Sequence, residues 1–267
     1  MIYEEFFGKK PVIGVVHLLP LPGSPKFDGD FEGIVERALN DALKYYEGGV
    51  DAIIVENYGD KPFSIRVERV ETIAAFATIA HLIRREVDLP LGLSLLRNSG
   101  PEAIGVAYVV GADFIRVNNL CQVLVSPEGL LNPVGREVAE KRRELNAWNI
   151  KVFADVNVKH ATPVAQTPLE EVVKDCEERC LADAIIVTGR RTGEETSLEE
   201  LLKVKSYTTL PVLVGSGVTV DNIERYWRYA DGFIVGTYFK KNGVTTNPVD
   251  IGRVKKLMKK VEKLRTQ

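Results

Sequence analysis

Residues 211–223, PVLVGSGVTVDNI, decide the fold class of this chain. An apolar run predicts a buried strand over 211–214, and it leads directly into Gly215, Ser216 and Gly217 and then into a helix with Asp221 near its start. Strands of a parallel sheet that is covered on both faces have near-continuous apolar runs of this kind. The segment is therefore one strand–turn–helix unit.

The same unit recurs along the chain. Each further apolar run predicts a strand, and each is followed by a segment with apolar residues at the three- and four-residue spacing of a helix face. The predicted strands are 12–17, 51–56, 91–95, 113–117, 151–155, 184–188, 211–214 and 232–235. The predicted helices are 31–47, 64–86, 100–110, 134–147, 168–180, 197–204, 220–229 and 248–265.

Eight alternating units favour a (β/α)8 TIM barrel over a doubly wound open sheet. No dinucleotide-type G-x-G-x-x-G follows the first strand, and the number of strands matches barrel closure. No shift in composition and no low-complexity tract marks a linker, so residues 1–267 are predicted to form a single domain.

Composition excludes several classes of protein. A hydrophobic content of 45% supports a large core, and a net charge of −2 argues against nonspecific nucleic-acid binding and against a basic membrane-docking face. The N-terminus lacks the order of a signal peptide, and no run approaches the roughly 20 apolar residues of a membrane span. We expect a cytoplasmic protein without membrane insertion, and its many Glu and Lys residues resemble those of thermophile proteins.

The three cysteines, Cys121, Cys176 and Cys180, give little indication of a metal site. Cys176 and Cys180 are four residues apart on a predicted helix, without a nearby histidine or second cysteine pair. We interpret them as small apolar helix residues, and the low, odd number of cysteines predicts a reducing compartment.

Polar residues gather where the predicted strands end, which is where (β/α)8 barrels place their active sites. The candidate catalytic residues are Asp155, Glu56, His17, His160 and Lys159. The candidate substrate-binding residues are Asn57, Arg97, Asn118, Asn157 and Thr188. Helix caps and solvated loop residues are the alternative for any single member, but burying so many polar groups is costly unless they are used.

Two alternatives stay open at this cluster. Lys159 is expected to contact an anion, with a Schiff base to substrate as the alternative. No cofactor is required, although Glu56, Asp155 and a histidine would offer ligands to a divalent metal ion.

The turns after the last two strands predict a phosphate site. Glycines let backbone N–H groups approach an anion closely, and a helix N-terminus adds a favourable dipole. The candidate phosphate-binding residues are Gly215, Ser216, Gly217, Gly236 and Thr237. Barrels commonly bind phosphate after strands seven and eight, and the alternative is a tight turn without a ligand.

One connection is long and rich in proline. Residues 18–30, LLPLPGSPKFDGD, follow the first strand and cannot form a helix because Pro20, Pro22 and Pro25 interrupt it. This loop is either a lid over the barrel mouth or a stiff rim around it.

The chain resembles the BtpA family, whose members include SgcQ-like proteins. The resemblance rests on KPVIGVVHLLPLPGSP (10–25), DAIIVENYGDKPF (51–63), ADFIRVN (112–118), KVFADVNVKHA (151–161), DAIIVTGRRTGEETSLEEL (183–201), PVLVGSGVTVDNI (211–223) and ADGFIVGTYFKKNG (230–243). It implies a TIM barrel related to phosphate-binding barrels, and in photosynthetic bacteria a link to photosystem I biogenesis. It supplies no catalytic residues, and GLSLLRNS (92–99) departs from the family pattern at positions 94 and 99.

Three functions follow as hypotheses. The first is an enzyme acting on a phosphorylated sugar or nucleotide-like molecule, as an isomerase, lyase or glycosidic-bond hydrolase using acid–base catalysis. The second is a non-catalytic assembly or stability factor, which would have an apolar or oligomeric surface. The third is a metal-assisted phosphohydrolase. A phosphorylated small molecule is the expected partner, and homo-oligomers are compatible with each hypothesis.

Overall fold

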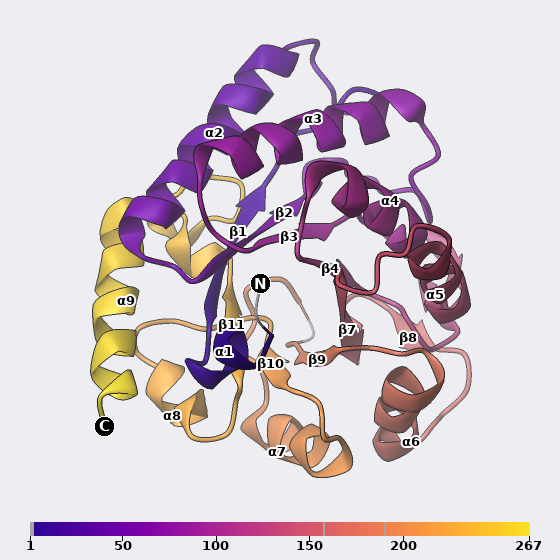
Figure 1. The fold of residues 1–267 in the computed structure, drawn as a ribbon, viewed down its shortest axis with the longest axis vertical. Helices are drawn as coiled ribbons and strands as arrows, with labels where there is room; N and C mark the ends of the chain where they lie inside the picture. The colour runs from indigo at the N-terminus through magenta and orange to yellow at the C-terminus, as the bar shows by residue number, and fades with distance from the viewer. Residues whose placement is uncertain (1–2, 157, 190) are drawn as a thin grey trace.

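The computed structural model confirms the predicted (β/α)8 barrel (Figure 1). It describes residues 3–156, 158–189 and 191–267. Its barrel strands are β1 (Val12–His17), β2 (Ala52–Glu56), β3 (Leu91–Ser94), β4 (Phe114–Val117), β7 (Lys151–Val156), β9 (Ala184–Val187), β10 (Val212–Val214) and β11 (Gly232–Val235). They pair in parallel in the closed order β1-β11-β10-β9-β7-β4-β3-β2.

Helices surround this barrel. They are α2 (Phe31–Gly48), α3 (Val70–Glu86), α4 (Gly100–Val110), α5 (Gly135–Glu144), α6 (Leu169–Lys174), α7 (Leu198–Tyr207), α8 (Ile223–Trp227) and α9 (Ile251–Arg265), with a π-helical turn, η1 (Asp175–Arg179), after α6. The predicted caps of α2 are confirmed: the Asp30 side chain accepts from the Gly33 N–H, and Gly49 ends the helix with a φ of 83°.

Alternate residues of each strand face opposite sides, which separates two apolar layers. Outward residues such as Ile115 and Val117 pack under the helices, whereas inward residues such as Phe114 and Phe153 fill the barrel. The Phe114 and Phe153 rings are stacked, with centroids 4.5 Å apart. Further along the same inward faces, towards the strands' carboxyl ends, the side chains become polar and charged.

A short N-terminal helix, α1 (Tyr3–Gly8), was not predicted. Phe6 is buried against the inward layer, and its ring centroid lies 6.3 Å from that of Phe114. Figure 1 shows α1 in front of the barrel centre. The helix therefore covers the end of the barrel where Phe114 and Phe153 stack, and the polar layer lies beyond them.

A small antiparallel sheet was also not predicted. It has the order β6-β5-β8 and consists of β5 (Leu124–Ser126), β6 (Gly129–Leu131) and β8 (Thr162–Pro163). It joins the loop after β4 to the loop after β7. Such short strands carry too little periodicity to be distinguished from loops in the sequence.

The predicted start of the third helix at residue 64 was wrong, because α3 begins at Val70. Residues 64–69 bond instead to the loop after β3: Val67 N–H donates to Ser99 Oγ, and Asn98 N–H donates to the Ile65 carbonyl. These tertiary contacts replace the helical hydrogen bonds that the local apolar pattern favours.

The interpretation of the cysteines needs correction. Cys176 forms a disulfide with Cys121 from the loop after β4, 55 residues away, and Cys180 is the free thiol. The barrel brings the loop after β4 and the η1 turn together, which their separation in the sequence could not reveal. The low, odd number of cysteines was the reason to expect a reducing compartment. With two of the three in a disulfide, that reason no longer holds.

The long loop after β1 behaves as a rim. Leu21 is fully buried and its N–H donates to Asp60 Oδ1 at 2.8 Å, while Thr72 Oγ1 donates to the Pro22 carbonyl at 2.6 Å. These contacts fix residues 18–22 to the β2 loop and to α3, which favours the rim over the lid.

Close packing of the inward layer is testable at Gly92. An added Cβ would lie 2.3 Å from the Phe114 ring, so Gly92→Ala should lower the free energy of unfolding by about 1–3 kcal/mol. Gly105 in α4 has no heavy atom within 4 Å of such a Cβ, and Gly105→Ala should stabilise by about 0.5–1 kcal/mol. Urea unfolding of both variants measures the difference, and equal effects would contradict this packing.

Candidate active site

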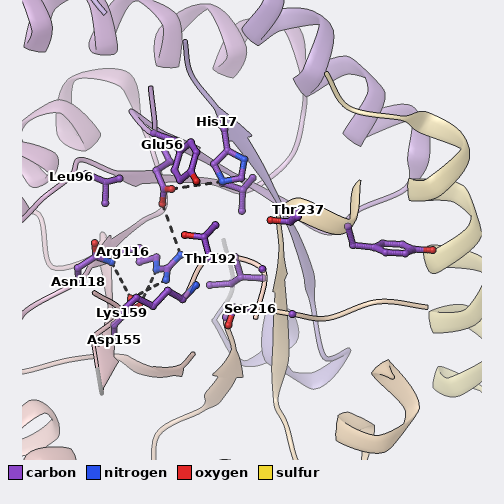
Figure 2. Close-up of a pocket in the computed structure, with 18 of the residues that line it drawn as sticks. His17, Glu56, Leu96, Arg116, Asn118, Asp155, Lys159, Thr192, Ser216 and Thr237 are labelled. Carbon is purple, nitrogen blue, oxygen red and sulfur yellow. Dashed lines mark hydrogen bonds and ion pairs between the residues drawn. The ribbon is translucent and has the colours of Figure 1, made fainter. Parts of the chain in front are cut away.

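A cavity of about 300 Å³ opens at the carboxyl ends of the strands (Figure 2). It is lined by most of the predicted site residues. These are His17, Glu56, Arg97, Asn118, Asp155, Lys159, His160, Gly215, Ser216, Gly217, Gly236 and Thr237. The prediction that strand ends converge on one site is thus met in the geometry, while the role of each residue stays a prediction.

Arg116 and Asp155 form a buried, bidentate ion pair at the cavity floor. Arg116 Nε donates to Asp155 Oδ1 at 2.9 Å and Nη2 donates to Oδ2 at 2.8 Å. Asn118 Nδ2 also donates to Oδ2, at 2.9 Å. Because both carboxylate oxygens are occupied and the paired guanidinium keeps a raised pKa, Asp155 is placed to hold Arg116 rather than to exchange protons.

Glu56 has a different environment although it is also buried. Its Oε1 lies 3.7 Å from His17 Nε2, and its Oε2 lies 3.9 Å from Arg116 Nη1. Both distances are longer than a hydrogen bond allows. Among the described residues, no hydrogen bond to the Glu56 side chain is found. Figure 2 shows Glu56 between His17 and Arg116. The carboxylate therefore borders the cavity and is available to a ligand.

The neighbouring imidazole is neutral at physiological pH. Burial lowers the pKa of His17 well below its usual value, and the nearby charges of Lys240, Lys159 and Arg116 lower it further. The contact between His17 and Glu56 is thus not an ion pair at neutral pH. A neutral His17 can donate or accept a hydrogen bond at a reacting group.

Hydrogen bonds lead from the floor to Lys159 at the mouth. Arg97 Nη1 donates to Asn118 Oδ1 at 2.9 Å, and its Nη2 donates to the Lys159 carbonyl. Burial and the neighbouring charge of Arg116 lower the pKa of Lys159 to about 8. No hydrogen bond or ion pair of its ammonium group occurs within the described part of the chain. His160 lines the same edge from an exposed position.

The predicted phosphate loops fold tightly against each other. Ser216 Oγ accepts from the Gly189 N–H at 2.6 Å and donates to the Glu194 carbonyl at 2.9 Å, so this hydroxyl joins the β9 and β10 loops. Gly217 has a φ of 69°, and a Cβ there would lie 2.3 Å from Glu195 Cα. This turn requires glycine.

Backbone donors remain for an anion at these loops. The N–H groups of Gly217 and Val218 have no acceptor among the described residues, and neither do those of Thr237 and Tyr238. All four residues line the cavity. Thr237 Oγ1 lies 2.9 Å from Thr245 Oγ1, which fixes its side chain.

Two predicted substrate-binding residues do not line the described cavity, and a third lies outside the described residues. Asn57 is fully buried and bonds to Asp60 and to the Leu96 backbone, which gives it a structural role. The hydroxyl of Thr188 is buried without a partner among the described residues and does not line the cavity. Asn157 lies outside the described residues.

Sequence reasoning missed Arg116, Tyr58, Lys61, Thr192 and Arg253, which also line the cavity. Arg116 could have been found, because residues 114, 116 and 118 share one face of a strand. An arginine at an inward position of a buried strand needs a partner. Arg253 lies in α9, many residues after β11 ends at Val235, and no pattern in the sequence marked it as a residue of the site.

The metal alternative gains no geometric support. Among the described residues, no group of three His, Cys, Asp or Glu side chains is arranged to hold a metal ion. Of the candidate ligands, Asp155 directs both oxygens at Arg116 and Asn118. Glu56, Asp155 and His17 therefore do not form a ligand set as they stand.

Comparison with known proteins agrees with this architecture. A sequence model of the BtpA family matches residues 8–263. This chain belongs to the BtpA family. A Pyrococcus horikoshii protein is 50% identical over 259 residues, covering 97% of this chain and 98% of that protein. The photosystem I biogenesis protein BtpA of Synechocystis is 39% identical over 254 residues, covering 95% of this chain and 88% of that protein.

Among solved structures, thiamine phosphate pyrophosphorylase from Pyrococcus furiosus shares the fold, with a TM-score of 0.57 and 17% identity. The match covers 97% of this chain and 98% of that chain. No described helix of this BtpA-family protein is both long and apolar enough to cross a membrane.

The depressed pKa of Lys159 predicts a pH effect on stability. Between pH 8 and 10.5 the unfolded state binds more protons at this site than the folded state, so stability rises with pH there. Lys159→Met removes this contribution. The variant should be more stable than the wild type at pH 7, and its advantage should shrink across that range. Denaturant titrations at several pH values measure it, and a constant advantage would refute the shifted pKa.

Proposed function

We propose that this BtpA-family protein is an enzyme that acts on a phosphorylated small molecule by acid–base catalysis at the barrel mouth. The observation that carries the proposal is the Glu56 carboxylate, which is buried, lacks a hydrogen bond among the described residues and borders the same cavity as the Gly217 and Thr237 loops. The chain shares its fold with thiamine phosphate pyrophosphorylase, and this analogy at the level of the fold supports the proposal.

The roles divide between the two carboxylates. Glu56 would take a proton from the substrate and return it at another atom, because it is the carboxylate whose oxygens are open to a ligand. Arg116, held by Asp155, would stabilise negative charge that develops on a substrate oxygen. Lys159 and neutral His17 would complete the donors around that oxygen.

This division favours an isomerase or lyase over a glycosidic-bond hydrolase. Most glycosidases use two carboxyl groups, one on each side of the bond that is cleaved. Here Asp155 is engaged by Arg116 and Asn118, which leaves Glu56 as the available carboxylate at the described floor. Proton transfer next to a carbonyl needs one base and a set of donors for the oxygen.

A second candidate is an assembly or stability factor. It is favoured by the name of the Synechocystis relative and by exposed apolar side chains on the small sheet. These are Val125 in β5 and Leu130 in β6, with Val123 and Val164 directly beside the strands. An assembly role would use this outer face and would be indifferent to substitutions at Glu56.

Glu56→Gln separates the two functions. Sugar phosphates incubated with the wild type in D2O should exchange carbon-bound hydrogen or form product, as followed by proton NMR. The variant should lose about 10²–10⁴-fold in rate, because glutamine cannot accept the proton.

Glu86→Gln, at the exposed end of α3, is the matched control and should keep the wild-type rate. Wild-type turnover in Glu56→Gln would remove the assigned base. Turnover by no sugar phosphate, together with an assembly defect on polar substitution of Val125 and Leu130, would favour the second candidate.

A further inference from the structure

The lining of the cavity carries an excess of positive charge. Among the described residues that line it are the basic side chains Lys61, Arg97, Arg116, Lys159 and Arg253, against the carboxylates Glu56 and Asp155. Burial lowers the pKa of His17 well below its usual value, so this imidazole adds no charge at neutral pH, and partial burial with the nearby charge of Arg97 also lowers the pKa of His160. The whole chain has a net charge of −2, so this excess is local to the cavity.

Part of this positive charge already has partners. Arg116 is paired with Asp155, and Arg97 donates to Asn118 and lies with its Nε 3.6 Å from Glu128 Oε2. Lys159 differs, because its half-buried ammonium group has neither a hydrogen bond nor an ion pair among the described residues. The charges that act on it are those of Arg116 and Arg97 together with the carboxylates of Asp155 and Glu56. An anion bound there would give the ammonium group a direct partner.

A separate positive group stands beside the phosphate loops. Arg253 Nε donates to the Tyr238 carbonyl at 2.5 Å, and its guanidinium lies 4.5 Å from the Tyr238 ring centroid. Tyr238 directly follows Thr237, so Arg253 sits next to the backbone donors of that loop. This arrangement places one positive charge in the cavity lining beside the Thr237 loop.

The closed strand order puts these two positive groups across the barrel from each other. In the ring of strands, β10 stands opposite β3, and β11 stands opposite β4. Arg97 follows β3 and is fixed by Asn118 after β4, whereas Gly217 follows β10 and Thr237 follows β11. Figure 2 shows Ser216 and Thr237 on one side and Arg116 and Asn118 on the other.

We propose that the substrate carries two anionic groups. One is a phosphate bound by the Gly217 and Thr237 loops, and the other is a carboxylate or second phosphate held by Lys159 and Arg97. This inference rests on the proposed function and specifies its substrate class. Glu56 ends β2, which stands between β3 and β1 in the ring of strands, so it would lie beside the middle of such a ligand, where the proton would be transferred.

Matched ligand pairs test the second anionic group. Glycerol 3-phosphate and 3-phosphoglycerate differ by a carboxylate, and fructose 6-phosphate and fructose 1,6-bisphosphate differ by a phosphate. Calorimetric titration of the wild type should give at least tenfold tighter binding of the doubly anionic member in one pair or both. The pair that shows the gain identifies the second group.

Two variants assign the ends. In Lys159→Gln the gain within the responding pair should fall at least fivefold, because a positive charge at that end of the cavity is lost. Thr237→Asp places a carboxylate at the phosphate end and should weaken both members of each pair alike. Lys203→Gln, on the exposed face of α7, is the matched control and should leave all affinities unchanged.

The results of these titrations distinguish a failure of the two-anion inference from a failure of the proposed phosphate site. Equal binding within both pairs, with Thr237→Asp still weakening them, would overturn the two-anion inference and leave the phosphate site standing. An unchanged gain in Lys159→Gln would overturn the assignment of Lys159. Binding of none of the four ligands would contradict the phosphate site itself, and the inference with it.

Discussion

The buried ion pair between Arg116 and Asp155 organises the whole site. Removing two charges from water is costly, and the pair is stable only with good geometry and additional hydrogen bonds. Both conditions are met, because two parallel bonds join the side chains and Asn118 donates a third hydrogen bond, to Asp155 Oδ2. Asn118 then fixes Arg97, which holds the backbone of Lys159. One interaction thus positions the floor and one side of the mouth.

The same pair decides what Glu56 can do. Since Arg116 directs its two short hydrogen bonds at Asp155, it approaches Glu56 only to 3.9 Å. Two buried carboxylates with similar surroundings in the sequence therefore acquire different properties. One holds a cation, and the other borders the cavity with no hydrogen bond to its oxygens among the described residues. On the opposite side of the cavity, the groups offered to an anion are backbone N–H groups. The Gly217 turn there has no room for a Cβ.

The sequence predicts the barrel well and the site only in outline. Apolar strands and capped helices such as α2 follow from local periodicity, and the barrel rule then brings Glu56, Asp155 and Gly217 to one end. Features that depend on contacts between loops are different. The pairing of Cys121 with Cys176, the late start of α3 at Val70 and the β5–β8 strand pair arise from neighbours distant in the sequence.

Individual roles were the hardest to predict. Asp155 and Glu56 were both candidates for the base, and only the position of Arg116 separates them. Asn57 looked like a strand-end ligand, but its amide is used within the β2 and β3 loops. Arg116 was missed because FIRV (114–117) has the composition of an apolar strand. Only the alternation of its side chains between the two faces of the sheet shows that Arg116 points into the barrel.

The central claim is that the Gly217 and Thr237 loops hold a phosphate above a floor made by Arg116, Asp155 and Glu56. A crystal structure of the protein grown or soaked with glycerol 3-phosphate tests it most directly. The account predicts phosphate density within hydrogen-bond distance of the Gly217 and Thr237 N–H groups, with the Arg116–Asp155 pair intact. A ligand-free cavity at saturating concentration, or a phosphate bound outside these loops, would contradict it.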